Sequence, residues 1–297
     1  MNPKTLIALS LLSSLPIQAA TYTWLGTAND GDWNNAANWN GNLVPVDSDA
    51  GQAGLSFSNT TDKIVFNGPA PTSNTPDIGG HNSDGTTPTL EFNQGGTYNM
   101  SLASSAGVWS YPTGDRTVFT VGDGLGTTKS DVVLNLSLGT NAALNRHSRH
   151  MRATYLVDSD ATLNFDTSLL SLTYNTDSRY TTINLAGGDA TIDGFLRHSI
   201  NATVSEGDAN YGEDSYILFS EAGSSFTANY GGGDFADFAA VQADADNLFR
   251  ADSGVELSVI DNGNNSFTIT SAAAVPEASS TALLGLGGLL LGLKRRR

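Results

Sequence analysis

Short stretches in which apolar and polar residues alternate recur along most of this chain. The clearest one runs from Val132 to Leu138, where apolar residues at every second position are separated by Val, Asn and Ser. Further stretches of the same kind are Thr89–Phe92, Thr162–Phe165, Thr182–Leu185, Val255–Val259 and Ser266–Thr270. Because a period of two residues places alternate side chains on opposite faces of a strand, the pattern predicts an all-β body of short strands. Each strand would have one apolar face and one face rich in Thr, Asn or Ser.

Three of these stretches belong to an internal repeat. DVVLNLSLG begins at Asp131, DATLNFDTS at Asp160 and DATIDGFLR at Asp189, so the copies start 29 residues apart. A weaker copy, GSSFTANYG, begins at Gly223 after a spacing of 34 residues. Strands that recur in this way favour a β-solenoid, similar to a parallel β-helix, in which each coil buries its apolar face on the next. A β-sandwich is the alternative for a chain with so many short alternating strands.

Asparagines flanked by apolar residues occur at Asn135, Asn164 and Asn184. On stacked strands of a solenoid, these residues would lie beside one another on the outer face. We therefore expect their side-chain amides to form a row.

The chain divides into five segments. A Trp-rich segment, residues 21–50, is expected to cap the first coil, residues 51–233 to form the solenoid body, and residues 234–274 to cap the other end. Within the last of these, the stretch from Asp234 to Ala251 breaks the strand rhythm and predicts one short helix. The helix and the strands after it would cover the open end of the solenoid and prevent edge pairing there.

Residues 1–20 have the features of a secretory signal peptide. A positive charge at Lys4 precedes an apolar stretch from Leu6 to Leu15, and the small residues Ala19 and Ala20 follow. This order predicts export and removal of the segment. Exported proteins usually contain disulfides, but this chain has no cysteine. We expect packing and backbone hydrogen bonds alone to hold its body together.

The formal net charge of the chain is −16. A surface with this charge repels phosphate backbones, which predicts that nucleic acid is not a partner. Cations, cationic proteins and neutral or cation-bridged glycans are compatible with it.

The fifth segment, residues 275–297, contains 12 residues without a polar side chain, from Ala282 to Leu293. As a helix they would cover roughly 18 Å, which is short for a bilayer that needs about 20 apolar residues. The basic residues that follow would stay on the cytoplasmic side; they are Lys294, Arg295, Arg296 and Arg297. This arrangement predicts a temporary membrane tether, with the rest of the chain outside.

The order of features in this tail resembles the PEP-CTERM sorting signal of Gram-negative bacteria. A short motif at Val275, Pro276 and Glu277 precedes the Leu/Gly run and the Arg-rich end, although Ala278 stands where the family has a second proline. The resemblance implies cleavage by an exosortase-type processing enzyme. It also implies transient contact with the inner membrane, delivery to the cell surface or extracellular matrix, and an association with exopolysaccharide.

The Trp-rich segment contains Trp24, Trp33 and Trp39. It resembles the opening segment of exported, autotransporter-like β-helical proteins. One interpretation is a sugar-binding platform, since indole rings stack on sugar faces while nearby Asn and Asp bind hydroxyls. The other is a plug that fills the first coil, which the large apolar area of the indoles favours.

Asp and Asn cluster in four segments, which are Asn29–Asp32, Val46–Gly51, Val157–Asp160 and Asp261–Asn265. Alternate carboxylates in a loop can bind one Ca²⁺, but none of these segments matches the EF-hand loop. Because Asn, Asp and Gly also stabilise turns, turn formation explains most of them. We predict no cofactor, and a Ca²⁺ site stays open as an alternative.

A basic segment, RHSRHMR, contains Arg146, Arg149 and Arg152. The guanidinium groups would suit an anionic group on a glycan, such as a uronate or a sulfate. Ion pairs with Asp158 and Asp160 are the alternative, since both lie shortly after this segment in an acidic chain.

Motifs for catalysis are scarce in this sequence. It has no cysteine nucleophile, no Gly-x-Ser-x-Gly motif and no phosphate-binding glycine loop. We therefore expect a non-catalytic structural or adhesive protein of the cell surface or extracellular matrix. The alternative is a secreted carbohydrate-binding or polysaccharide-cleaving module, because the many carboxylates leave acid and base pairs of a glycosidase or lyase open.

Overall fold

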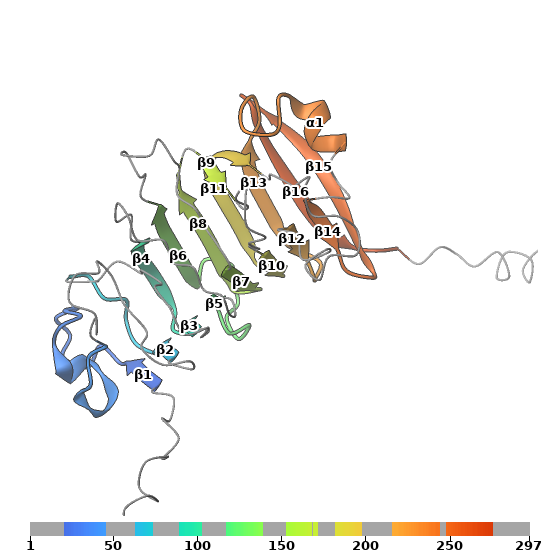
Figure 1. Ribbon diagram of the computed structural model, residues 1–297. Helices are drawn as coiled ribbons and strands as arrows, with labels where there is room; N and C mark the ends of the chain where they lie inside the picture. Colours follow the sequence, from blue (N-terminus) through green and yellow to red (C-terminus); the bar gives the residue numbers. More distant parts are fainter. Residues whose placement is uncertain are drawn as a thin grey trace, which may run out of the picture.

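A computed structural model describes residues 21–45, 63–73, 89–102, 117–138, 153–167, 169–171, 182–197, 216–243 and 248–275. These residues form two β-sheets (Figure 1). The first sheet consists, in spatial order, of β1 (Thr21–Trp24), β2 (Lys63–Phe66), β3 (Thr89–Phe92), β5 (Thr117–Val121), β7 (Ala153–Asp158), β10 (Thr182–Ala186), β12 (Tyr216–Phe219) and β14 (Phe249–Ala251). All of its neighbouring strands are parallel.

The second sheet consists of β4 (Gly96–Leu102), β6 (Val132–Leu138), β8 (Ala161–Asp166), β11 (Asp189–Arg197), β13 (Ser225–Asn229), β16 (Ser266–Ala273) and β15 (Val255–Gly263). A short strand, β9 (Leu169–Ser171), also pairs with β11. The strands from β4 to β13 are parallel, whereas β16 runs antiparallel to both β13 and β15.

From β3 to β13 the chain visits the two sheets in turn, so each coil adds one strand to each sheet. The coils succeed one another from β1 at one end to β15 at the other (Figure 1). The predicted all-β fold and β-solenoid are confirmed, since a sandwich of antiparallel hairpins would not alternate in this way.

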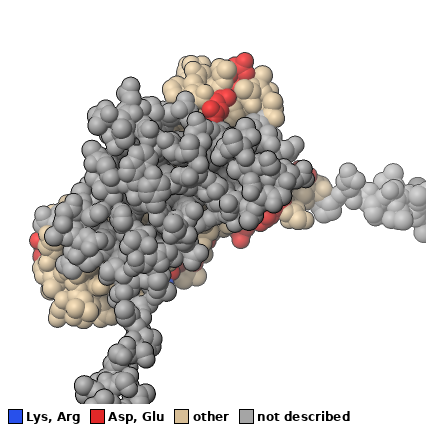
Figure 2. Space-filling view, in the orientation of Figure 1, with Lys and Arg blue, Asp and Glu red and all other residues tan. Residues whose placement is uncertain are grey.

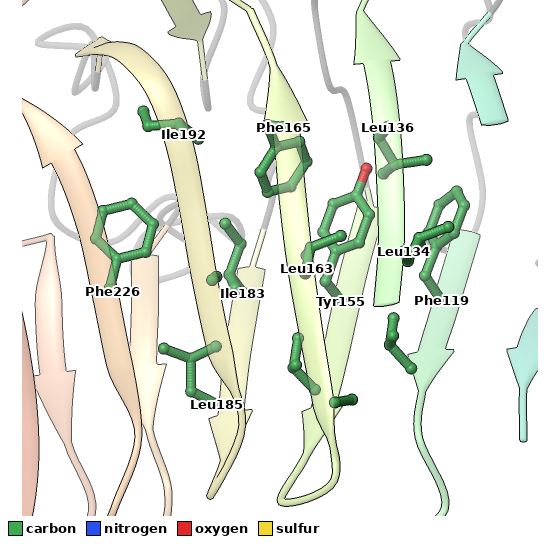
Figure 3. Packing of buried hydrophobic residues seen from close by; sticks show 14 of the residues in the cluster. Phe119, Leu134, Leu136, Tyr155, Leu163, Phe165, Ile183, Leu185, Ile192 and Phe226 are labelled. Atoms are coloured by element: carbon green, nitrogen blue, oxygen red, sulfur yellow. The ribbon is translucent and has the colours of Figure 1, made fainter. Parts of the chain in front are cut away.

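Side chains of both sheets fill the interior between them, because every second residue of each strand points inward. Aromatic rings of successive coils stack directly: Phe66 lies 4.7 Å from Phe92, and Phe119 lies 4.8 Å from Tyr155, measured between ring centroids. Figure 3 shows Phe165 of the second sheet beside Tyr155 of the first, with 5.3 Å between their centroids. The alternation in the sequence therefore corresponds to one continuous core.

The repeat spacing is only partly kept in the structure. Asn135 pairs with Asn164, which preserves the predicted 29-residue register. In the next coil, however, Asn164 pairs with Thr191, and Asn184 lies in β10 of the first sheet. The expected alignment of Asn184 with the other two asparagines is therefore wrong, because a chain that alternates between two sheets carries similar strands in both.

The short turn between β10 and β11 requires glycine. A Cβ atom on Gly188 would lie 2.4 Å from the backbone oxygen of Asp158 in the preceding coil, and Gly187 has a φ of +85°. Successive coils approach closely at this edge because the turn carries no side chains.

The predicted C-terminal helix is shorter than expected. Within the described residues, α1 spans Phe238–Ala243, and Phe249–Ala251 is strand β14 rather than helix. Phe249 is fully buried and pairs with Ile217 at the end of the first sheet. Burial of this aromatic side chain and the sheet hydrogen bonds outweigh the local helical preference.

Candidate binding surface

A straight row of uncharged polar side chains crosses the outer face of the second sheet. The strand registers place its members directly opposite one another in successive strands. They are Asn99, Asn135, Asn164, Thr191, Thr227 and Thr268, which we call the polar row. Since neighbouring strands lie about 4.8 Å apart, the row presents an amide or hydroxyl group at that interval.

Hydrogen bonds between the coils fix five of the six side chains of this row. Asn164 Nδ2 donates to Asn135 Oδ1 at 2.9 Å, and Asn135 Nδ2 donates to Asn99 Oδ1 at 2.8 Å. At the other end, the hydroxyl groups of Thr227 and Thr268 lie 2.9 Å apart. Each amide of the asparagine chain keeps a second N–H and a second oxygen lone pair, because only one of each is used along the row.

The surroundings of the polar row are acidic or neutral. Asp166 and Asp193 are exposed beside it, and the carboxylate of Asp189 is paired with Lys129 at 2.5 Å. Figure 2 shows acidic side chains at several places on the visible face of the described residues. The surface therefore suits a neutral ligand with many hydroxyl groups better than an anionic one.

Of the row, only Asn135 and Asn164 were singled out in the sequence, together with Asn184. Asn99 lies 36 residues before Asn135 and therefore escapes the 29-residue repeat. Its position in the alternating stretch Thr97-Tyr98-Asn99-Met100 was the available signal. The threonines carry no signal of their own, because Thr is frequent in all strands of this chain.

The three tryptophans of the N-terminal segment form a compact cluster inside the first coil. Trp24, Trp33 and Trp39 are 0%, 1% and 2% exposed. The centroids of Trp33 and Trp39 lie 4.7 Å apart in an edge arrangement. Trp39 Nε1 donates to the backbone oxygen of Trp33 at 2.8 Å, and Trp24 Nε1 to that of Pro69 at 2.6 Å. In this conformation the three indole rings pack against one another. Contact with a sugar would therefore require the cluster to open.

Asp30 holds the loop around this cluster. Its carboxylate accepts hydrogen bonds from the side-chain amides of Asn35 and Asn38, both at 2.6 Å, and from the backbone N–H of Asp32 at 3.0 Å. These bonds, with that of Asn35 the largest cause, lower the pKa of Asp30. The Asp30 carboxylate therefore stabilises this loop by accepting hydrogen bonds from it.

The two other Asp-rich segments that the structure describes also use their oxygens within the protein. Asp160, which is 2% exposed, accepts from the backbone N–H groups of Gly124 at 3.1 Å and Gly126 at 2.9 Å. Asp261 accepts from the N–H of Gly263 and the hydroxyl of Tyr230. Across the described ranges, no group of three or more His, Asp or Glu side chains is arranged to hold a metal ion. The calcium candidate at 46–51 lies outside those ranges, so a Ca²⁺ site stays open as the alternative to the predicted absence of a cofactor.

A cluster of carboxylates marks the edge where β7 turns into β8. Burial raises the pKa of Asp158, and the nearby negative charges of Asp160, Glu221 and Asp123 raise it further. By contrast, hydrogen bonds from the hydroxyl and N–H of Thr128 and the N–H of Thr127 lower the pKa of Asp131.

Several predicted site residues lie outside the described part of the chain. These are Arg146, Arg149, Arg152, Pro276, Glu277, Lys294, Arg295, Arg296 and Arg297. Val275, the first residue of the predicted sorting motif, is 79% exposed. Among the described residues, no helix has the length and apolar character required to cross a membrane.

No family model, curated protein or solved structure matches this chain. The resemblance of the tail to a sorting signal and that of the Trp-rich segment to autotransporter-like proteins remain predictions.

Proposed function

We propose that the protein is an exported, non-catalytic structural or adhesive component of the cell surface or extracellular matrix, and that the polar row is its adhesive surface. The observation that carries this proposal is the regular spacing of amide and hydroxyl groups on a continuous β-sheet. Such groups, held by their neighbours, lose little conformational freedom when a ligand binds.

A neutral polysaccharide is the ligand that fits this surface. Its hydroxyl groups both donate and accept hydrogen bonds, as do the amides and hydroxyls of the row. An extended glycan lying across the strands would meet a partner on each coil, so that many weak contacts add up along the polymer.

Binding can be tested with the protein isolated from its host and a panel of neutral and acidic polysaccharides. The double variant Thr191→Val, Thr227→Val removes two hydroxyl groups and keeps the β-branched shape. We expect it to weaken retention by a neutral polysaccharide, whereas Thr120→Val on the outer face of the first sheet leaves retention unchanged. Equal retention of both variants would exclude the polar row as the adhesive surface.

The proposed route to the cell surface rests on the two ends of the sequence. Removal of residues 1–20 and cleavage near Val275 by an exosortase-type enzyme would follow transient insertion in the inner membrane. The intact mass of the protein from extracellular material tests this route. A mass that retains Lys294–Arg297, found in the inner-membrane fraction, would overturn it.

The second candidate is a carbohydrate-binding or polysaccharide-cleaving module. The same polar row favours the carbohydrate-binding function of this candidate. Cleavage would release reducing ends or unsaturated sugars from a polysaccharide. Absence of such products across a broad panel, together with retention on one member, would separate adhesion from cleavage.

A further inference from the structure

Among the described strands, β15 is the outer one at the C-terminal end of the second sheet, and it forms a long free edge there. It spans nine residues and stands last in the sheet order, with β16 as its neighbour. Ala274 N donates to Gly254 O at 2.8 Å, and antiparallel ladders alternate. The backbone groups of Glu256, Ser258 and Ile260 therefore point to β16, while those of Leu257 and Val259 point to the free edge.

At the opposite end of the solenoid, the outer strand of the first sheet is protected. Strand β1 has only four residues, and Trp24 forms an antiparallel bridge with Trp39. The next two backbone N–H groups, of Leu25 and Gly26, both donate to Asn38 O. The Trp-rich segment thus occupies the first edge, and no equivalent segment of the described chain pairs with β15.

Strand β15 also lacks the residues that usually discourage edge pairing. Between Val255 and Ile260 it contains no Lys, Arg or Pro, and its one charge, Glu256, lies on the outer face. The bulge that disturbs the ladder comes only after Asp261. A regular edge with a single charge between Val255 and Ile260 is a template for another strand.

The inner face of β15 is incompletely covered. Val255, Leu257 and Val259 point toward the core and are only partly buried. The second sheet extends here beyond β14, the last strand of the first sheet, and is covered in part by α1. The apolar side chains that remain partly exposed are those next to the free edge.

We propose that a second copy of this chain pairs with β15 antiparallel, about a two-fold axis at Leu257. Leu257 then faces Leu257 of the other copy, and Val255 faces Val259 of the other copy. The three inner side chains of each copy together form one apolar strip. A shift of the axis to Ser258 would instead place Val255 opposite Asp261. Because Val255 N already donates to Asp252 O at 3.0 Å, the pair of Val255 and Val259 has one hydrogen bond in this register, from Val259 N of the other copy to Val255 O.

Sedimentation of the chain isolated from its host tests this proposal. We expect the mass to rise with concentration toward twice that of one copy. Leu257→Pro removes an edge N–H and Val259→Lys places a charge on the inner face, so both should raise the dimer dissociation constant at least tenfold. Leu125→Lys removes a side chain that is 83% exposed elsewhere and should leave the mass unchanged. Far-ultraviolet circular dichroism and urea midpoints establish that each variant is folded.

The register has its own test. About the Leu257 axis, Ser258 lies opposite Glu256 of the other copy, so Ser258→Lys should tighten the dimer about two- to fivefold and Ser258→Glu should weaken it. About a Ser258 axis, both variants would place like charges opposite each other and weaken the dimer. Weakening by Ser258→Lys therefore overturns the register. A monomer at all concentrations up to about 1 mM, or a dimer insensitive to Leu257→Pro and Val259→Lys, overturns the proposal, and neither result depends on glycan binding.

Discussion

Asn164 donates its side-chain amide to Asn135 Oδ1 in the neighbouring coil, at 2.9 Å, and Asn135 continues the chain to Asn99. Asn135 is thus both donor and acceptor in the middle of a three-residue chain. Asn135 therefore links three successive coils through side chains on the outer face of the sheet.

Replacement of Asn135 by Ala should lower the free energy of unfolding by about 1–2 kcal/mol, because two hydrogen bonds between coils are lost. Urea denaturation measures the change. Asn93→Ala is the control, since the Asn93 amide meets Asn67 Oδ1 at 3.5 Å on the exposed surface. An equal loss in both variants would mean that the row adds nothing beyond ordinary surface contacts.

Replacement of Asp160 by Asn should cost about 1–3 kcal/mol, because an amide can accept only one of the two N–H groups of Gly124 and Gly126 and its own N–H₂ meets the other. Asp123→Asn serves as control, because Asp123 is exposed and accepts from Leu125 N alone. Thermal denaturation of the two variants gives the comparison. An unchanged melting temperature for Asp160→Asn would show that the glycine-rich turn does not require a carboxylate.

The carboxyl group of Asp158 should make the protein less stable as the pH rises. Its folded pKa lies above the ordinary value of 3.8, so the folded chain binds the proton more tightly than the unfolded chain. The free energy of unfolding therefore falls as the pH increases from about 3.8 through the folded pKa. Asp158→Asn should raise the urea midpoint at pH 7 and have little effect on the midpoint below pH 3.8.

Asp131 provides a comparison of opposite sign. Its folded pKa is lowered by hydrogen bonds from Thr128 and Thr127, so it stabilises the fold above the ordinary pKa and this effect is lost as the pH falls through the folded pKa. Asp131→Asn should lower the midpoint at pH 7 and lose its effect in acid. Parallel pH profiles for the two variants would contradict at least one of the two assignments.

The tryptophan cluster should fluoresce as a buried site. In a Trp109→Phe background, which leaves Trp24, Trp33 and Trp39 as the only indoles, we expect a blue-shifted emission maximum and weak quenching by acrylamide. Addition of polysaccharide should leave the spectrum unchanged. A glycan-dependent shift would instead support these three residues as a sugar contact.

Several strands of this protein could be predicted because the alternation in their own sequence is sufficient evidence. The alternation from Val132 to Leu138 reflects the period of one strand and its burial on one face. The pairing of Asn135 with Asn164 followed from one repeat length. Registers elsewhere depend on the lengths of the turns between strands, and alternation alone does not say to which sheet a strand such as β10 belongs.

The candidate surface was predictable only in part for the same reason. A row of side chains on six strands requires five correct registers, and one shifted coil moves a residue out of line. The burial of Trp24, Trp33 and Trp39 agrees with a plug, which local composition favours. The tertiary contact that converts the segment from 249 to 251 into a strand has no local signal.

The position of β16 between β13 and β15 determines how the protein would resist a pull on its C-terminal tail. A load applied at Val275 along the strand would be shared by two antiparallel ladders at once, and their hydrogen bonds would be strained in shear rather than opened one after another. The hydroxyl of Ser271, which accepts from Ser224 N at 2.9 Å and donates to Glu221 O at 2.7 Å, ties this strand to a third segment. Strand β16 would therefore resist such a load through both of its ladders together.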